Sequence, residues 1–232
     1  QDQEGGALVN PIGDALADGH VRFFGLELRV GPGALVPRKE TELLARTVLD
    51  HLAGDAALAI DVCSGTGNLA CAIAHHRPNL RIFALELLRA SVELALENVR
   101  TLGFGARVHV REGDLFAPLE GEGIEGVCDV VVCNPPYISS GRLGGERASL
   151  LELEPREAFD GGPYGVAIQQ RVVRDALAFL RPGGFLAFEV GAGQAKQVHA
   201  LFQRSKGYDP PVSIDDDEGV PRVLLARKVK SP

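Results

Sequence analysis

Short apolar runs alternate with helical periodicity along the chain from residue 57 onward. Continuous apolar runs of this kind are typical of strands that a parallel sheet buries on both faces. We expect strands at 58–62, 81–85, 107–110, 129–133 and 185–190. Two more apolar runs, at 208–214 and 220–227, flank an acidic turn and predict a strand pair that finishes the sheet with an antiparallel edge.

The segments between these runs have the i, i+3, i+4, i+7 spacing of amphipathic helices. Val92 and Val173 each open such a series, which ends before Gly103 in the first case and before 181–184 in the second. Another helix is expected to start near Lys39. Strands that alternate with helices form βαβ units, so we expect an α/β fold whose mostly parallel sheet is covered on both faces. Sheets of this kind bind ligands at the carboxyl ends of their strands.

Two segments depart from the alternation. Residues 1–38 contain a possible hairpin at 21–30 and are expected to form a lid in front of one domain at 39–232. Residues 138–165 are rich in glycine and have no sustained periodicity, and a connection of that length is usually functional or mobile. Because it starts just after the strand expected at 129–133, it is expected to close over the site at the end of that strand.

Composition and charge limit the class of protein and the kinds of molecule that it binds. The 232 residues are 45% hydrophobic, which allows a substantial core, and no apolar run approaches the roughly 18 residues of a membrane helix. The first four residues lack the basic start of a secretion signal, so we expect a soluble cytoplasmic protein. The net charge of −7 argues against nucleic acid as a stable partner, because affinity for phosphate comes largely from Lys and Arg.

The cysteines carry no metal signal. They form no C-x-x-C pair and have no histidine at zinc spacing, so we expect reduced thiols and no metal site. The four are Cys63, Cys71, Cys128 and Cys133.

A glycine-rich motif at 61–68 indicates a nucleoside ligand. It follows the first expected strand and opens a helix, where glycines let the backbone pass close to a ligand. Glu86 ends the next strand and can accept hydrogen bonds from two ribose hydroxyls, and Asp114 can accept one from an adenine amine. Asp114 is equally suited to capping a helix. The pattern Gly65-x-Gly67 with Glu86 also fits the dinucleotide fingerprint of an NAD enzyme.

The tetrad Asn134-Pro135-Pro136-Tyr137 follows the strand expected at 129–133. Proline lacks an N–H group and fixes its own φ, so the tetrad predicts a rigid bend that leaves the sheet at a set angle. A stiff turn with a packed Tyr137 is one interpretation of it. The other is a bend that aims an amide and a backbone carbonyl at a substrate.

In this order, the motifs resemble the HemK family of class I methyltransferases. This family uses S-adenosylmethionine to methylate the glutamine side-chain amide in the Gly-Gly-Gln motif of peptide-chain release factors. Further support comes from segments 37–42, 153–156 with 160–162, and 189–191 with Gln194, and the resemblance spans roughly residues 22 to 228. It implies a doubly wound, Rossmann-like sheet of seven strands with one antiparallel strand. The sequence departs from the family in Cys63, where glycine is usual, in Glu86, where Asp is usual, and in lacking the usual N-terminal helical domain.

The resemblance also implies the cofactor, S-adenosylmethionine, and the site residues. Residues 63–67 would lie along its methionine part, Glu86 would hold the ribose, Asp114 and Leu115 the adenine, and Asn134 would touch both cofactor and substrate. The implied cofactor-binding residues are Asp61, Cys63, Ser64, Gly65, Thr66, Gly67, Glu86, Asp114, Leu115 and Asn134, and the implied catalytic residues are Asn134, Pro135 and Tyr137.

The side chains of the tetrad are suited to holding an amide nitrogen for methyl transfer. An amide nitrogen is a poor nucleophile, because its lone pair is delocalised into the carbonyl. The Asn134 side-chain oxygen and the Pro135 carbonyl can accept its two N–H bonds and turn the lone pair toward the methyl group, while Tyr137 stacks on the amide. The expected partner is a protein, most simply a release factor. A nucleobase or small-molecule acceptor, an NAD-dependent oxidoreductase and a non-enzymatic nucleoside-binding module stay open, as does the oligomeric state.

Overall fold

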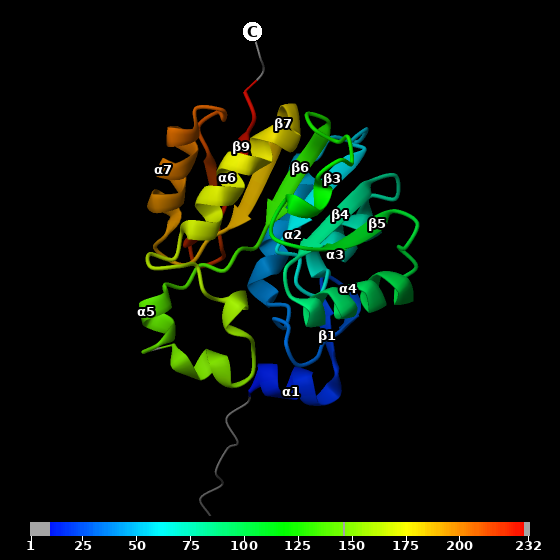
Figure 1. Ribbon diagram of the computed structural model, residues 1–232, viewed down its shortest axis with the longest axis vertical. Helices are drawn as coiled ribbons and strands as arrows, with labels where there is room; N and C mark the ends of the chain where they lie inside the picture. Colours follow the sequence, from blue (N-terminus) through cyan, green and yellow to red (C-terminus); the bar gives the residue numbers. More distant parts are fainter. Residues whose placement is uncertain (1–9, 146, 230–232) are drawn as a thin grey trace, which may run out of the picture.

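The computed structural model describes residues 10–145 and 147–229. Its centre is a seven-stranded sheet in the order β5–β4–β3–β6–β7–β9–β8 (Figure 1). The strands are β3 (Leu58–Val62), β4 (Arg81–Glu86), β5 (Val108–Glu112), β6 (Cys128–Cys133), β7 (Leu180–Glu189), β8 (Val212–Asp215) and β9 (Pro221–Arg227). Strands β3 to β7 are parallel, and β9 is antiparallel to both of its neighbours. The predicted α/β sheet with one antiparallel strand is confirmed.

Helices cover both faces of the sheet. Residues of α2 (Glu42–His51), α3 (Asn68–His76) and α4 (Arg89–Thr101) share one core, and those of α6 (Ala167–Phe179) and α7 (Ala195–Ser205) share the other. Alternate residues of each strand supply the two cores, so that Ala59 packs into the first and Ile60 into the second. This two-sided burial is why the strands read as continuous apolar runs.

The observed elements differ from the predicted ones in a few places. Helices α1 (Pro11–Asp18) and α7 were not predicted. The strand expected at 185–190 begins earlier, at Leu180, which pairs with Cys128 across an irregular stretch. Of the strand expected at 208–214, only residues 212–214 lie in β8, which ends at Asp215, and Tyr208 makes an isolated bridge with Lys228.

The carboxyl ends of the parallel strands are covered by irregular segments. The expected hairpin is present as β1 (His20–Phe23) and β2 (Leu26–Arg29). The 138–165 segment contains α5 (Ser140–Leu143) and the short 3-10 helices η3 (Ala148–Glu152) and η4 (Arg156–Ala158). Figure 1 shows α1, the hairpin and the α5 segment together at the lower end of the view, below the sheet. Two further 3-10 turns are η1 (Lys39–Thr41), which leads into α2, and η2 (Ala117–Leu119).

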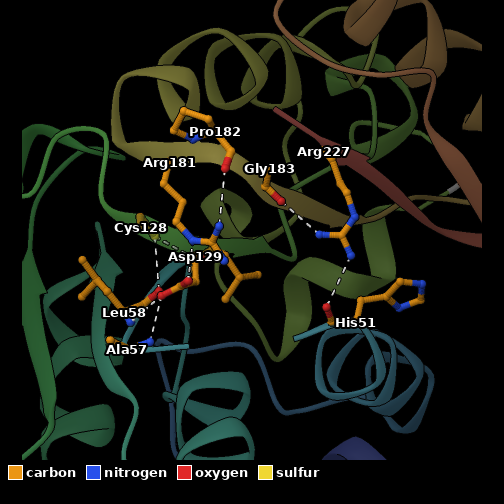
Figure 2. Close-up of polar contacts among 10 residues, drawn as sticks. His51, Ala57, Leu58, Cys128, Asp129, Arg181, Pro182, Gly183 and Arg227 are labelled. Carbon is orange, nitrogen blue, oxygen red and sulfur yellow. Dashed lines mark hydrogen bonds and ion pairs between the residues drawn. The ribbon is translucent and has the colours of Figure 1, made fainter. Parts of the chain in front are cut away.

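The opposite end of the sheet is held by Asp129 (Figure 2). Its Oδ2 accepts hydrogen bonds from the backbone N–H groups of Ala57 and Leu58 at 2.8 and 3.0 Å. Its Oδ1 lies 2.6 Å from Nε of Arg181. Partial burial raises the pKa of Asp129, but these hydrogen bonds outweigh burial and leave the pKa below its usual value. This cluster ties the starts of β3, β6 and β7 together, far from the carboxyl ends that carry the predicted site.

Among the helices of residues 10–145 and 147–229, none combines the length and apolar character needed to cross a membrane. The same residues contain no group of three or more His, Cys, Asp or Glu side chains placed to hold a metal ion. All four cysteines are free thiols.

Candidate active site

A cavity of about 270 Å³ lies at the carboxyl ends of β3 to β6. The sheet order reverses between β3 and β6, and ligands of doubly wound sheets bind at such a switch point. Six of the predicted site residues line this cavity, and they are Cys63, Gly65, Glu86, Asp114, Leu115 and Asn134. The fold therefore brings side chains from four strand ends into one pocket.

The loop between β3 and α3 has an unusual backbone. Cys63, Gly65 and Gly67 have φ values of 58°, 56° and 77°, in the left-handed region. A Cβ atom on Gly67 would come within 3.3 Å of the Ala95 side chain, so α4 packs directly against this turn. Glycine tolerates the left-handed conformation, whereas Cys63 adopts it with a side chain in place. The loop thus turns tightly enough to carry Cys63 and Gly65 along the cavity wall.

Other predicted residues of this loop lie behind the cavity wall. Asp61, Ser64, Thr66 and Gly67 are buried and do not line the cavity. Asp61 Oδ2 accepts a hydrogen bond from the Ala70 N–H at 3.0 Å, which fixes the start of α3. Asp61 Oδ1, Ser64 Oγ and Thr66 Oγ1 have no hydrogen-bond partner among the described residues. Buried polar atoms usually have partners, so these three atoms indicate that the loop receives polar groups from a ligand or water.

Glu86 is held in place at the end of β4. Its carboxylate accepts hydrogen bonds from the backbone N–H groups of Gly65 at 2.8 Å and Leu88 at 2.9 Å. Burial raises the pKa of Glu86, although these backbone hydrogen bonds oppose the shift. Burial also raises the pKa of Asp61 well above its usual range, and the nearby Glu86 adds to this effect. A cationic ligand in the cavity would oppose both shifts, because a nearby positive charge favours the ionised form of a carboxyl group.

The adenine side of the predicted site is more open. Asp114 lies on the loop after β5, and its Oδ2 is 2.6 Å from Nη2 of Arg171 on α6. Leu115 beside it is buried and has a φ of 50°. The sequence pattern did not identify Arg171, since nothing in α6 marks which exposed residue faces the loop. The ion pair shows that Asp114 binds a neighbouring helix rather than capping its own.

The tetrad that follows β6 is fixed from several sides. Asn134 Nδ2 donates a hydrogen bond to Thr41 Oγ1 at 3.2 Å. The Tyr137 carbonyl accepts one from Gln194 Nε2 at 2.7 Å. A Cβ atom on Gly191 would lie 2.9 Å from Cδ2 of Tyr137, so the ring packs directly on that glycine. Burial raises the pKa of Tyr137 to about 12, and the nearby Glu189 contributes, so its phenol stays neutral at ordinary pH.

Asn134 lies where cavities meet. Besides the main cavity, it lines a smaller one of about 50 Å³ that Pro135, Tyr137 and Leu35 also line. One side of the tetrad thus faces a nucleoside-sized pocket, and the other faces a recess large enough for a small side-chain group. This arrangement can hold a donor and an acceptor on either side of one asparagine.

The cover of the cavity is anchored by Glu154. Its carboxylate accepts a hydrogen bond from the Val36 N–H at 2.8 Å and forms an ion pair with Arg38. These contacts join the segment after the hairpin to the 138–165 segment, and both contribute residues that line the cavity. The resemblance to the family pointed to both segments, but sequence spacing could not show that they bind each other.

Glu154→Ala is expected to lower the free energy of unfolding by about 1–3 kcal/mol, because it leaves the buried Val36 N–H and the partly buried Arg38 without their acceptor. Urea unfolding followed by circular dichroism measures the change. The solvent-exposed Glu152 on the same segment is the matched control, and Glu152→Ala is expected to stay within about 0.5 kcal/mol of wild type. Equal losses in the two variants would contradict an anchoring role for Glu154.

Comparison with known proteins agrees with this geometry. A family model described as a methyltransferase small domain matches residues 38–147. A release factor glutamine methyltransferase from Moorella thermoacetica is 37% identical over 209 residues, which are 90% of this chain and 72% of that protein. The chain belongs to the release factor glutamine methyltransferase family. The HemK resemblance is therefore confirmed, and the chain is a methyltransferase rather than an NAD oxidoreductase or a non-enzymatic binding module.

Solved structures of other methyltransferases share the fold of this chain. A methyltransferase from Pyrococcus furiosus has a TM-score of 0.64 and 20% identity, covering 94% of this chain and 93% of that one. A release factor-specific protein-(glutamine-N5) methyltransferase from Alicyclobacillus acidocaldarius has a TM-score of 0.51 and 23% identity, covering 87% and 99%. Family membership implies S-adenosylmethionine as the methyl donor.

Proposed function

We propose that the protein transfers a methyl group from S-adenosylmethionine to the side-chain amide nitrogen of a glutamine, that of the Gly-Gly-Gln motif in a peptide-chain release factor. The observation that carries the proposal is the position of Asn134, which lines both the nucleoside-sized cavity and the smaller recess beside Pro135 and Tyr137. An acceptor in the recess would lie next to a donor in the larger cavity.

The residues of the larger cavity fit the cofactor. The unpartnered buried oxygens of Asp61, Ser64 and Thr66 lie in the loop that would receive its amino-acid part. Glu86 retains lone pairs for the ribose hydroxyls, and Asp114 with Leu115 lines the pocket where the adenine would lie. The positive sulfur of a bound cofactor would favour the ionised forms of Asp61 and Glu86, whose pKa values burial raises. S-adenosylmethionine, when bound, supplies a methyl group on a positively charged sulfur, which makes the methyl transferable without metal or redox chemistry.

The residues of the smaller recess fit a planar amide. The Asn134 side-chain oxygen and the Pro135 carbonyl would accept the two N–H bonds of the substrate, and this would turn its nitrogen lone pair toward the larger cavity. Tyr137 would lie against the amide plane and exclude water. Because its pKa is raised to about 12, Tyr137 does not act as a base near neutral pH. The proton can leave after transfer.

We also propose that residues 1–38 act as a lid. Leu35 lines the main cavity and both of the small ones beside Asn134, and the ion pair of Arg38 with Glu154 holds this segment across the opening.

Mass spectrometry of a release factor incubated with the enzyme and S-adenosylmethionine tests the function. We expect a gain of about 14 daltons, one CH₂, on the glutamine of the Gly-Gly-Gln motif, and none when that glutamine is replaced by alanine. A thermal shift with S-adenosylmethionine but not with NAD is the expected companion result, since a ligand that binds only the folded state raises its melting temperature.

The outcomes of this test are separable. Stabilisation by S-adenosylmethionine without methylation of the release factor would move the proposal to a nucleobase or small-molecule acceptor. An absence of any shift with S-adenosylmethionine would overturn the assignment of the larger cavity.

A further inference from the structure

A buried carboxylate lies behind the tetrad and is connected to it. Glu189, at the end of β7, is 3% exposed. Its Oε2 accepts a hydrogen bond from the hydroxyl of Thr41 at 2.6 Å, and Thr41 is itself 1% exposed. Thr41 Oγ1 accepts in turn from Asn134 Nδ2 at 3.2 Å. The three side chains come from η1, the end of β7 and the residue after β6, and are separated by up to 148 positions in sequence.

The chemistry of these groups gives the chain of hydrogen bonds a direction. An ionised carboxylate can only accept hydrogen bonds, so the single hydroxyl proton of Thr41 goes to Glu189. The Thr41 oxygen then has only lone pairs to offer, so it can only accept a hydrogen bond from its other neighbour, Asn134. Only the NH₂ end of the Asn134 amide can supply one, which places Nδ2 against Thr41 and Oδ1 on the other side.

We propose that Thr41 and Glu189 are positioning residues that set the orientation of the Asn134 amide, so that its oxygen rather than its NH₂ group meets the substrate. This inference rests on the proposed function, because an acceptor oxygen is needed only if the substrate presents N–H bonds. If the amide were turned over, the NH₂ group of Asn134 would face the N–H bonds of the substrate. Both groups are hydrogen-bond donors, so the substrate nitrogen would not be held.

The surroundings of Glu189 suit this role. Its charge also acts on Tyr137, where it contributes to the raised pKa of the phenol, so one buried group influences both ends of the tetrad. Burial raises the pKa of Glu189 and the neighbouring Glu40 adds to this, whereas the hydrogen bond from Thr41 and the charge of Arg222 on β9 favour the ionised form. The same carboxylate therefore fixes Asn134 through Thr41 and acts electrostatically on Tyr137.

Substitutions at Thr41 give the most direct test. Thr41→Val removes the hydroxyl at nearly constant volume and is expected to lower kcat about tenfold, the order expected for loss of one orienting hydrogen bond. The Kd for S-adenosylmethionine is expected to stay within about twofold, since Thr41 does not line the main cavity. Thr41→Ser keeps the hydroxyl and is expected to retain most of the wild-type kcat. In Glu189→Gln, the new amide can donate to Thr41 and so reverse the direction of the hydrogen bonds. This variant is expected to lose activity as Thr41→Val does.

A matched control lies six residues further along the chain. Thr47 on α2 is also a buried threonine, and its hydroxyl donates to the Leu43 carbonyl at 2.8 Å. Thr47→Val is expected to leave kcat unchanged. In an Asn134→Ala background, Thr41→Val is expected to have no further effect on kcat, because the group that it orients is absent.

A second readout does not depend on activity. In a ¹⁵N–¹H spectrum, the side-chain NH₂ resonances of Asn134 are expected to shift in Thr41→Val and to return in Thr41→Ser. The inference is overturned if Thr41→Ser is as impaired as Thr41→Val, if the two losses add in the double variant, or if the Asn134 resonances do not move. Failure of the wild-type enzyme to methylate a release factor would instead contradict the proposed function, and the spectrum would still report on Asn134.

Discussion

Replacing Asn134 with alanine is expected to lower the rate of methyl transfer by about 10²–10³-fold, the size of effect seen when one hydrogen bond that holds a reacting group is removed. Asn134 lines both cavities, and its side-chain oxygen is the proposed acceptor for the substrate amide. Without it, the nitrogen lone pair stays delocalised and unaligned. The measurement is kcat with a release factor at saturating S-adenosylmethionine.

The loss must be distinguished from a loss of folding or of cofactor binding. We expect Asn134→Ala to melt near the wild-type temperature and to be stabilised by S-adenosylmethionine to a similar degree. Asn79 is the matched control, because it is an exposed asparagine in the turn before β4, at the opposite end of that strand from the site. Asn79→Ala is expected to have wild-type kcat. An Asn134→Ala enzyme that methylates at nearly the wild-type rate would refute its proposed role.

Replacing Glu86 with alanine is expected to weaken binding of S-adenosylmethionine by about 10–150-fold, which corresponds to the 1.5–3 kcal/mol of hydrogen bonds to a charged group. Two effects combine in this variant. The ribose would lose its acceptor, and the Gly65 N–H would lose the partner that fixes the loop beside the cofactor. Isothermal titration calorimetry measures the Kd. Glu125→Ala, at an exposed turn before β6, is the control and is expected to bind normally.

The raised pKa of Glu86 gives this prediction a pH dependence. Because burial raises the pKa in the folded state, the folded protein binds this proton more tightly than the unfolded chain does. Acidification from neutral pH through the raised pKa of Glu86 therefore makes its contribution to folding more favourable and, by neutralising the carboxylate, weakens its hold on the ribose. We expect wild-type affinity to fall over this range more steeply than that of Glu86→Gln. Parallel curves for the two proteins would contradict a role for the ionised Glu86.

Local sequence signals were sufficient to predict the strands of the sheet and several residues that line the cavity. The core strands are buried on both faces and read as apolar runs. These runs predicted β3 with the bounds that the structure shows, and β4 and β6 with one end displaced by one residue. Residues 61–67, Glu86, Asp114 and Asn134 lie at or just after the carboxyl ends of strands, and parallel strands bring these ends to one edge of the sheet. The position of these residues in space therefore followed from the order of the strands.

Contacts between distant segments were not accessible to such signals. Thr41 with Glu189 and Arg171 with Asp114 are separated by 148 and 57 positions, and each pair meets only through tertiary packing. The helices α1 and α7 were missed for a local reason. Helix α1 is only eight residues long, and α7 carries just two buried side chains, Val198 and Phe202, so its apolar stripe is short.

The place of β9 in the sheet has a consequence for biosynthesis. This strand follows β8 in the chain but lies between β7 and β8, so a growing polypeptide exposes β7 as an open edge until residues 221–227 leave the ribosome. Arg222, the cation that favours ionised Glu189, emerges with the same strand. The larger cavity, proposed for the methyl donor, can therefore assemble on a nascent chain before the surroundings of the smaller recess, proposed for the methyl acceptor, are complete.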